Sequence, residues 1–486
     1  MRFSFVLLAV SCWLSAVSGQ YWTGPYQLTT SPGADVNPSA CKEWLGMGDL
    51  TCMAWQTNRA GNWDIYAKFC TFQQGNGWGP DEVVCADTAN DVNPSVAAVN
   101  DWQTDHPSFW CVWERRVRPD SGVILASFIT FRDQWGPAQR VGSFKHTGAD
   151  SAKPGIIVIR RGASDTTWVV WACEDSGIWY VEYSYNTDSV WSTPGIIVAQ
   201  REPIHDVRLG RGKHGQYYGC PLVVWESAGD IYYSEYRGAS WTVPAQVAPS
   251  PAIDRNADIL SYGPYTMSLG PWITWESTRE GDTAVFGTAM DTFSIARRWC
   301  DSTGAGDNYS PCGTPAEYTT DLWGPLATTW VSDRDGNPNI YSRLGLLPYP
   351  DVPVDTNHAQ DLHPTLTTLD VTMHWCCWQS DRSGNWDLWG SYVYMVGLAE
   401  ERDTPQAIRR TQDPTIVRGS LNLQLPISNR QSAELLDASG RRVADLRPGA
   451  NDVSRLAPGL YFVWRNLSFI TQHSAFADVA KVIIAK

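Results

Sequence analysis

The chain repeats one pattern of apolar and polar positions seven times. Each copy has a short apolar run that contains a tryptophan, a polar segment, and a second apolar run. Residues 222–225, 226–230 and 231–233 show the shortest form, which is typical of a strand, a tight turn and a second strand. A glycine such as Gly229 can adopt the positive φ that a tight turn requires. No stretch has sustained apolar spacing at three and four residues, so we expect little helix.

The copies are spaced by about 50 residues, which is the period of a propeller blade. Three of them, at 55–66, 330–341 and 378–388, have closely similar polar segments. The sequence therefore predicts an all-β fold with a seven-bladed β-propeller over residues 20–398. One tryptophan per copy is expected on the second strand of its blade, packed against the neighbouring blade. These residues are Trp55, Trp113, Trp171, Trp225, Trp275, Trp330 and Trp378.

A second motif, a tryptophan with a proline shortly after it, follows several of these hairpins. It occurs at 78–80, 135–137, 191–194 and 241–244, and an N-terminal copy at 22–25 has no hairpin before it. We interpret the motif as the start of each outer strand, where an edge position tolerates proline. The last hairpin, ending near Val396, has no copy behind it. The N-terminal strand is therefore expected to complete the seventh blade and close the ring, which removes open sheet edges.

Aspartates mark the expected entry to the innermost strand of several blades. The segments 35–38, 91–94 and 361–364 share an Asp-x-Asn/His-Pro pattern, with weaker counterparts near Asp150, Asp206 and Asp254. In a four-stranded meander, this entry and the long hairpin loop lie on the same face of the disc. Repeated aspartate, arginine, asparagine and tryptophan are therefore expected to converge there. Residues 296–315 are interpreted as a long insertion that makes blades five and six irregular.

The net charge and the N-terminal segment limit the partners and the cellular location that we expect for this protein. A net charge of −14 and a pI near 5.0 argue against a nucleic-acid partner or an anionic membrane surface. Residues 1–19 have a positive start, an apolar core and a small-residue cleavage region, as in a secretory signal peptide. No later stretch is apolar for long enough to form a membrane span.

Eleven cysteines follow that segment, and export would permit disulfides. Cys41 with Cys52 would join neighbouring strands of the first blade. Cys70 with Cys85 would join its outer strands, and Cys300 with Cys312 would close an irregular loop. Because the number is odd, at least one thiol stays free. No cysteine or histidine pair has zinc-ligand spacing, so no metal and no cofactor is expected.

The polar segments resemble the unit signature of TolB-type β-propellers, Ser-Asp-Arg-x-Gly-Asn-x-x-Ile-Tyr. Residues 332–341 and 380–388 match it best, and 57–66 match it nearly as well. The resemblance implies the propeller architecture and no particular activity, since propellers host many functions. The segment is also similar to the aspartate box of sialidases, although Arg382 stands where that box has its aspartate.

The composition changes after Gly397. Residues 399–412 form a charged linker, and 413–486 read as a small domain of short strands, a β-sandwich of Ig-like type. This domain includes a hairpin at 433–443, a Pro-Gly-x-Tyr-Phe segment at 458–462 and an apolar terminal run at 481–486. These segments resemble the C-terminal sorting domain of type IX secretion. The resemblance implies that the type IX machinery is a partner and that the protein is secreted or held on the outer cell surface.

The candidate ligand-binding residues come from the repeated loops and strand entries. Arginine and tryptophan next to aspartate suit a polar, ring-containing ligand such as a carbohydrate or a protein surface. These residues are Arg59, Trp63, Asp64, Arg382, Trp386 and Asp387 in the loops, with Asp35, Asp91 and Asp361 at the entries. The entry aspartates have a favoured alternative role as turn caps, and the tryptophans an equal alternative as packing residues. The segment 333–339 superficially suggests calcium, but its glycine comes too early for a helix–loop–helix site, so a hairpin turn is favoured.

Three classes of function remain open. We favour a secreted or surface-displayed propeller that binds a carbohydrate or protein ligand. The alternatives are a propeller enzyme acting on extracellular polysaccharide, and a structural repeat protein of the cell envelope. No catalytic residue is assigned, because the sequence shows no nucleophile motif and no histidine in a recognisable catalytic context.

Overall fold

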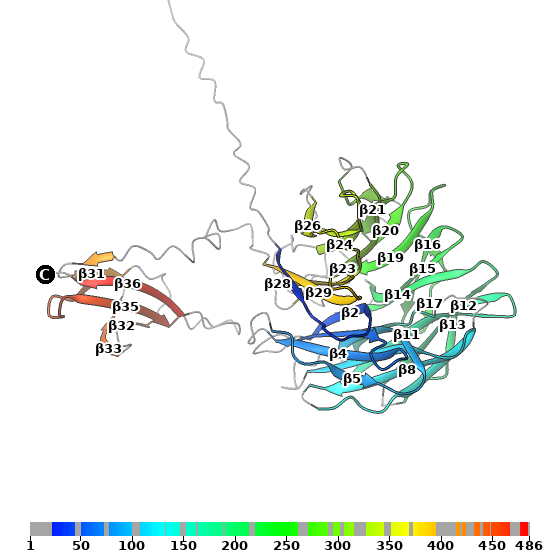
Figure 1. Ribbon diagram of the computed structural model, residues 1–486, viewed down its shortest axis with the longest axis horizontal. Coiled ribbons are helices and arrows are strands. Elements are labelled where there is room, and N and C mark those ends of the chain that lie inside the picture. The colour runs from blue at the N-terminus through cyan, green and yellow to red at the C-terminus, as the bar shows by residue number, and fades with distance from the viewer. Residues whose placement is uncertain are drawn as a thin grey trace, which may run out of the picture. The chain divides into compact units, whose positions relative to one another are not determined.

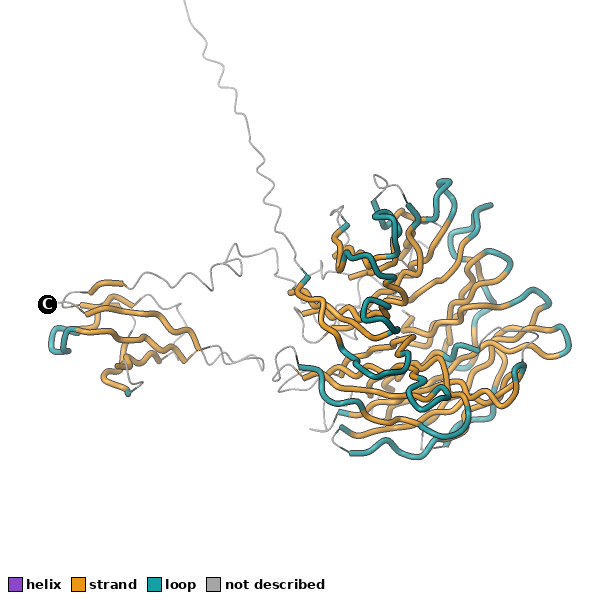
Figure 2. The backbone as a smooth tube through the Cα atoms, viewed as in Figure 1, coloured by secondary structure: helices purple, strands orange, loops and turns teal. Residues whose placement is uncertain are grey.

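The sevenfold repeat folds into seven antiparallel sheets that form the blades of a β-propeller (Figure 1). In the computed structural model the chain divides into two compact units, 1–396 and 397–486. The described residues contain strands and no helix (Figure 2), in agreement with the pattern. The structure describes residues 22–43, 50–71, 77–99, 107–131, 133–145, 152–161, 164–187, 190–212, 219–260, 271–289, 295–301, 306–314, 327–344, 351–368, 373–394, 415–417, 420–423, 432–437, 441–447, 449–466 and 477–484.

Each blade is a meander whose first strand is innermost. Blade one contains β2 (Asp35–Glu43), β3 (Leu50–Thr57), β4 (Asp64–Thr71) and β5 (Glu82–Cys85). Blade two contains β6 (Asn90–Val99), β7 (Ser108–Arg118), β8 (Ser121–Thr130) and β9 (Gln139–Lys145). Blade three contains β10 (Gly155–Arg161), β11 (Ser164–Asp175), β12 (Ile178–Asn186) and β13 (Gly195–Gln200). Blade four contains β14 (Ile204–Gly212), β15 (Cys220–Ser227), β16 (Asp230–Arg237), β17 (Ser240–Trp241) and β18 (Ala245–Gln246).

The remaining blades follow the same order. Blade five contains β19 (Asp254–Leu260), β20 (Trp272–Ser277), β21 (Ala284–Ala289) and β22 (Arg297–Arg298). Blade six contains β23 (Asn308–Thr314), β24 (Ala327–Ser332), β25 (Asn339–Leu344) and β26 (Val352–Asp355). Blade seven contains β27 (Asp361–Thr368), β28 (Met373–Ser380), β29 (Asp387–Tyr394) and the N-terminal β1 (Thr23–Gln27). The first strands β2, β6, β10, β14, β19, β23 and β27 contact one another in a closed series around the axis.

Ring closure by the N-terminal strand is confirmed. β1 pairs antiparallel with β29, with Thr23 opposite Tyr392 and Gln27 opposite Trp389. The Leu28 amide donates to the Leu388 carbonyl at 2.8 Å, which continues the pairing beyond β1. The seventh sheet is therefore assembled from both ends of the propeller sequence.

The blade tryptophans are buried between blades, as predicted. All seven second-strand tryptophans are 0% exposed. Trp113 of blade two packs in one cluster with Leu50 and Ile65 of blade one. Gly142 on β9 shows how closely they fit, because an added Cβ would lie 2.5 Å from the ring of Trp171. The repeat therefore encodes the interface between blades.

Three details differ from the sequence interpretation. The tryptophan–proline motif generally precedes the outer strand: Trp78 and Trp191 form isolated bridges, while β5 and β13 start later. The expected insertion at 296–315 contains β22 and also β23, the inner strand of blade six. Its entry reads Asn308-Tyr309-Ser310-Pro311 and lacks the aspartate that marks other entries.

The eleven cysteines of the described chain are free thiols. Cys41 and Cys52 do lie opposite each other on β2 and β3. Cys85 pairs with Ile65 rather than with Cys70, because β5 starts later than expected. Cys300 and Cys312 belong to different blades. The signal segment 1–19 and the linker 399–412 lie outside the described residues.

The second unit has its own sheets. β30 (Thr415–Val417), β36 (Ala477–Ile484), β35 (Gly459–Asn466), β32 (Ser432–Asp437) and β33 (Arg442–Leu446) form one, and β31 (Ser420–Leu423) pairs with β34 (Gly449–Asp452). The antiparallel pair β32–β33 is the hairpin expected at 433–443. Leu435, Leu446 and Val453 are buried within this unit.

Candidate functional site

The entry aspartates are buried in ion pairs within their own blades. Asp35, Asp91 and Asp361 are all 0% exposed. Asp35 accepts hydrogen bonds from the indole of Trp55 at 3.1 Å and from Arg59 at 3.2 Å. The repeated aspartate thus fixes the start of the inner strand against the blade tryptophan and the hairpin arginine.

Blades two and seven repeat this arrangement with small changes. Asp91 accepts from Trp113 at 3.0 Å and from Arg115 at 2.8 Å. Asp361 accepts from Arg382 at 2.8 and 2.9 Å. Burial raises the pKa of Asp361, while a hydrogen bond from Ser380 and the charge of Arg382 oppose that shift.

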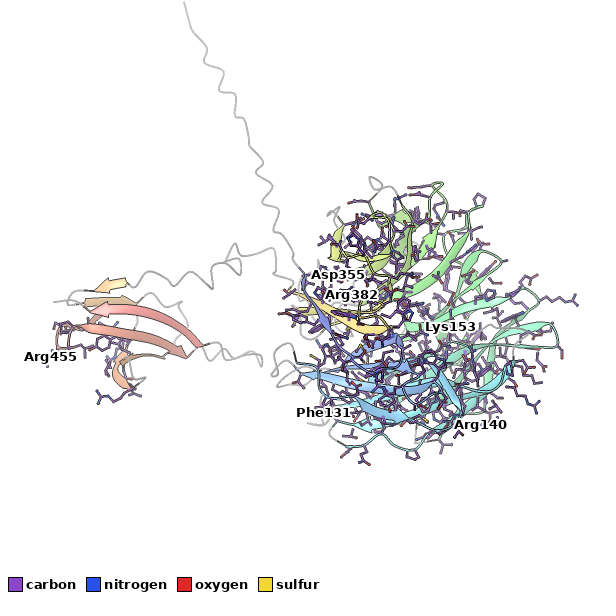
Figure 3. The ribbon with its side chains drawn as sticks, in the orientation of Figure 1. Phe131, Arg140, Lys153, Asp355, Arg382 and Arg455 are labelled. Atoms are coloured by element: carbon purple, nitrogen blue, oxygen red, sulfur yellow. The ribbon has the colours of Figure 1, made fainter. Side chains whose placement is uncertain are left out.

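The loop arginines point inward rather than toward a ligand face. Arg59 bridges Asp35 to Asp81 and lies over the ring of Tyr66 at 4.2 Å. Arg382 pairs with both Asp355 and Asp361, and Figure 3 shows Arg382 beside Asp355. Each guanidinium is therefore occupied by two carboxylates. One lies at the inner strand entry of its own blade, and the other lies near an outer strand, that of blade one for Arg59 and that of blade six for Arg382.

The other predicted loop residues connect adjacent blades. The carbonyls of Trp63 and Trp386 accept the amides of Asp91 and Asp35 at 2.8 and 2.7 Å. Both indoles are partly exposed. Asp64 and Asp387 are buried, and burial raises the pKa of each. Ring closure brings the loops of blades one and seven to the same segment, because Gly33 contacts Arg59 and accepts from Asn385.

These contacts account structurally for the arginines and aspartates of the predicted set. Ligand binding by the exposed parts of Trp63 and Trp386 stays a prediction. The segment 333–339 connects β24 to β25 as a hairpin turn.

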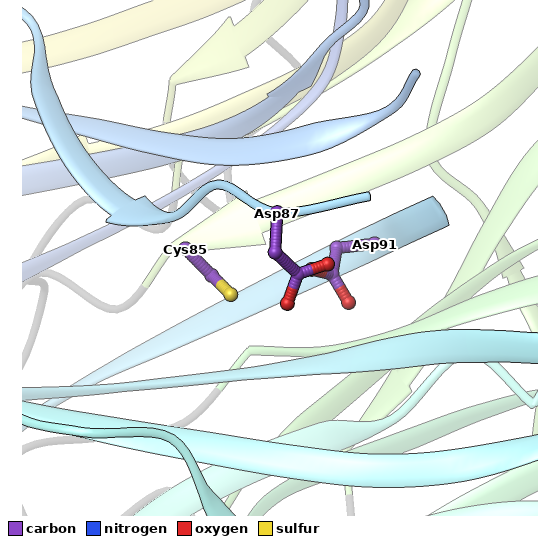
Figure 4. Close-up of side chains that lie close together, drawn as sticks. All are labelled: Cys85, Asp87 and Asp91. Atoms are coloured by element: carbon purple, nitrogen blue, oxygen red, sulfur yellow. The ribbon is translucent and has the colours of Figure 1, made fainter. Parts of the chain in front are cut away.

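One cluster has the residue types of a metal site. Cys85, Asp87 and Asp91 place their ligand atoms within 4.8 Å of one another (Figure 4). The Arg115 guanidinium contacts all three, at 3.1 Å from the Cys85 sulfur and 2.8 Å from Asp91. Burial raises the pKa of the Cys85 thiol to about 12, with Asp91 adding to the shift, so the thiol stays protonated. An arginine already neutralises this cluster, and we assign no metal to it.

A different ring of residues surrounds the axis. One residue near the start of each inner strand has a positive φ, between 39° and 53°. In six blades it lies at a shift in register between the first two strands, and Lys153 lies just before β10. We call these seven residues the axial ring. They are Asn37, Asn93, Lys153, Asp206, Asn256, Ser310 and His363.

In five of the seven blades, the residue after the blade tryptophan has a side-chain oxygen that accepts an amide at or next to this ring. Gln379 accepts the Asn37 amide at 3.0 Å, and Gln56 accepts the Asn93 amide at 2.8 Å. We call the corresponding seven positions the acceptor positions. They are Gln56, Glu114, Ala172, Glu226, Glu276, Val331 and Gln379.

The glutamates bond in the same way as the glutamines. Glu226 accepts from the Asn256 amide, and Glu276 accepts from the Ser310 amide at 3.1 Å. Glu114 accepts from Ala152, one residue before the axial-ring member Lys153, at 3.0 Å. Five of the seven blades are therefore joined to the following blade by a side-chain oxygen that accepts one of its amides.

A polar cavity of about 610 Å³ opens between the inner strands of blades three, four and five. It contains the axial-ring members of these blades and two of the acceptor glutamates. Its lining consists of Lys153, His205, Asp206, Glu226, Ala228, Gly229, Ile253, Arg255, Asn256 and Glu276. Figure 3 labels Lys153 within the propeller unit.

The charges of this cavity are only partly compensated. Lys153 and Asp206 form an ion pair across blades three and four. Partial burial raises the pKa of Glu226, and the nearby charge of Asp206 adds to the shift. The cavity thus contains the ion pair of Lys153 with Asp206, the carboxylates of Glu226 and Glu276, and the exposed Arg255.

Sequence reasoning identified the entry motif and singled out its aspartate. In Asp35-Val36-Asn37-Pro38 the aspartate is buried in an ion pair, and the asparagine two positions later is the axial-ring residue. The signal was available, because Asn and His tolerate positive φ. Glu226 and Glu276 directly follow the blade tryptophans. Glu226 was interpreted as part of the turn at 226–230, and Glu276 was not singled out.

Neither a known protein family nor a curated protein matches the sequence. Among solved structures, a protein of unknown function from Dyadobacter fermentans aligns with TM-score 0.43 and 10% identity, over 78% of this chain and 100% of that one. The fucose-recognising six-bladed lectin of Aleuria aurantia aligns with TM-score 0.40 and 12% identity, over 67% and 97%. The parainfluenza virus 5 hemagglutinin-neuraminidase ectodomain aligns with TM-score 0.39 and 8% identity, over 77% and 84%. At these TM-scores the likenesses carry no argument about ligand or activity.

Within the described residues, no helix is long and apolar enough to cross a membrane.

Proposed function

We propose that this protein is an extracellular binding protein whose ligand occupies the cavity between the inner strands of blades three, four and five. The observation that carries the proposal is this cavity of about 610 Å³ with its convergent charged and amide groups. Concave sites with a few placed polar groups are the usual ligand sites of proteins. The repeated loop arginines and aspartates are occupied by internal pairs, which leaves the cavity as the better-equipped surface.

A screen on glycan and peptide arrays, followed by variants, tests this proposal. Ile253 lines the cavity and is 44% exposed, so Ile253→Trp fills the opening without disturbing a buried residue. We expect at least a 10-fold loss of affinity for the array ligand. Ile295→Trp is the matched control, because Ile295 is 53% exposed and does not line the cavity.

The same assay decides between the cavity and the predicted loop surface. The double variant Trp63→Ala/Trp386→Ala should bind as the unaltered protein does if the ligand occupies the cavity. Loss of binding in this double variant, with full binding by Ile253→Trp, would move the site to the loops of blades one and seven.

One observation favours an enzyme as the second candidate. Glu226 and Glu276 line the same cavity, and a pair of carboxylates that flank the scissile bond performs glycoside hydrolysis. Release of reducing ends from polysaccharides, lost in Glu276→Gln, would support this candidate. Both glutamates accept backbone amides of the next blade, which suits fixed binding groups.

The proposed export from the cell rests on the signal-like segment 1–19 and on the resemblance of residues 413–486 to a sorting domain. Removing the chain after Gly397 should leave a folded propeller that is retained in the periplasm, because the second unit is a separate folding unit. Fractionation of cells producing the full and shortened chains measures this. Equal export of the two chains would contradict type IX sorting.

A further inference from the structure

The acceptor positions allow a comparison within the molecule. Gln56 and Gln379 accept the amides of the next blade through neutral side chains. Glu226 and Glu276 make the same type of bond with carboxylates. A neutral oxygen is therefore a sufficient acceptor at these positions, and the bond to the next blade does not require a negative charge. The charge at positions 226 and 276 calls for a separate explanation.

Most buried carboxylates near the axis have a cation of their own. Asp35, Asp254 and Asp361 pair with hairpin arginines. Glu114, the acceptor of blade two, pairs with Arg116 at 2.7 Å. Among the described residues neither Glu226 nor Glu276 forms an ion pair. A carboxylate removed from water without a partner is costly, and Glu276 is only 9% exposed.

The two unpaired glutamates belong to adjacent blades and line the same cavity. Each glutamate accepts one backbone amide of the next blade. A carboxylate has two oxygens and can accept further hydrogen bonds. The nearby Lys153 is already paired with Asp206, and Arg255 is exposed and makes no ion pair with either glutamate in the described part of the chain. Arg255 lies opposite Glu276 in the strand register, and the charges of Arg255 and His205 oppose the rise in the pKa of Glu226. These cations act without a direct ion pair, so among the described residues neither glutamate has a counter-charge in contact with it.

We propose that this cavity receives the basic side chain of a lysine or arginine from a protein partner, with Glu226 and Glu276 as its counter-charges. The inference rests on the proposed function and specifies its ligand. Ile253 and Ala228 at the lining suit the aliphatic stem of such a side chain. The lining residues include no tryptophan, tyrosine or phenylalanine on which a sugar ring would stack.

Size and charge agree with this ligand. A bare metal ion needs a compact set of ligand atoms, and the described residues form such a set only at Cys85, Asp87 and Asp91. The cavity of about 610 Å³ is far larger than an ion requires and has room for a long side chain. The net charge of −14 favours the approach of a basic partner.

The test uses blocked peptides with one central lysine or arginine, and the same lysine peptide after Nε-acetylation. Calorimetric titration should show binding of both basic peptides, weakened by added salt, and roughly 10-fold to 100-fold weaker binding of the acetylated one. Glu226→Gln and Glu276→Gln should each weaken binding of the basic peptides by a similar factor. Both variants keep the amide acceptor, as Gln56 and Gln379 do naturally, so the melting temperature should be retained.

Glu114→Gln is the matched control, because Glu114 has the same position in its blade and does not line the cavity. It should bind the basic peptides as tightly as the unaltered protein. Failure of both basic peptides to bind, equal binding of the acetylated peptide, or full binding by Glu226→Gln/Glu276→Gln would overturn the inference. A neutral array ligand that is lost in Ile253→Trp would overturn the ligand class while upholding the proposed function. If no ligand is lost in Ile253→Trp, the proposed function fails as well.

Discussion

Replacing Arg382 by alanine should lower the free energy of unfolding of the propeller by about 3–5 kcal/mol. Arg382 is the cation for Asp361, which is 0% exposed, and for Asp355, whose side chain is 8% exposed. Its removal leaves two carboxylates with little access to water and no opposite charge. Urea unfolding followed by tryptophan fluorescence measures the change, because the blade tryptophans are buried in the native state.

The pH dependence of this loss identifies its cause. In Arg382→Ala the pKa of Asp361 should rise further, because burial already raises it and the guanidinium no longer opposes that shift. A carboxyl whose folded pKa is raised binds its proton more tightly in the folded state, so stability falls as pH rises through that pKa. The deficit of the variant should therefore be smaller at pH 5 than at pH 8. A deficit that is equal at the two pH values would point to lost packing instead of lost charge.

An exposed ion pair provides the control. Lys145 and Asp175 pair at 3.2 Å on adjacent blades, with side chains that are 67% and 58% exposed. Lys145→Ala should cost less than about 1 kcal/mol, because solvent screens such a pair. If the two variants lose equal stability, the assignment of Arg382 to a buried network is wrong.

The architecture could be predicted because its determinants repeat in the sequence. Each blade tryptophan comes from the same position of its copy, so seven weak patterns reinforce one assignment. The N-terminal segment 22–25 could be placed because its motif had a missing partner at the other end of the propeller. Register was harder to predict, since it depends on bulges such as the one after Val36 that the alternation of residues does not reveal.

The site was less predictable because the conspicuous residues have partners inside the propeller. Asp361 and Arg382 stand out in the sequence because they recur, and the corresponding ion pair forms in blades one, two, five and seven. Residues that distinguish one blade from another are the ones that shape the cavity, and Glu276 is distinguished only by a missing partner. A missing ion pair is a property of the folded chain, which a single sequence does not show. The proposed site therefore rests on departures from the repeat and not on the repeat itself.

The ring closure predicts the second large effect, a loss of more than about 5 kcal/mol on deleting residues 20–30. Leu28 is 9% exposed in the cluster that joins blades one and seven, and Tyr26 packs on Trp375 and Tyr392. Truncating a single buried apolar side chain costs about 2–5 kcal/mol. The deletion removes the buried Leu28 and the partly buried Tyr26, and it also exposes β29 as an edge. Denaturant unfolding of the shortened chain measures the loss.

A variant in which β1 is moved to a later place in the sequence tests whether stability depends on the strand itself or on its position at the N-terminal end. Thr23 lies opposite Tyr392, so the start of β1 is close to the end of β29 at Tyr394. Residues 22–30 transferred to follow Tyr394 through a short hairpin loop can therefore occupy their native place. This variant should recover most of the lost free energy, whereas a transferred segment carrying Tyr26→Ser and Leu28→Ser should not. If the deletion leaves the unfolding midpoint unchanged, or if both transferred segments restore it equally, β1 does not close the ring through the contacts of its side chains.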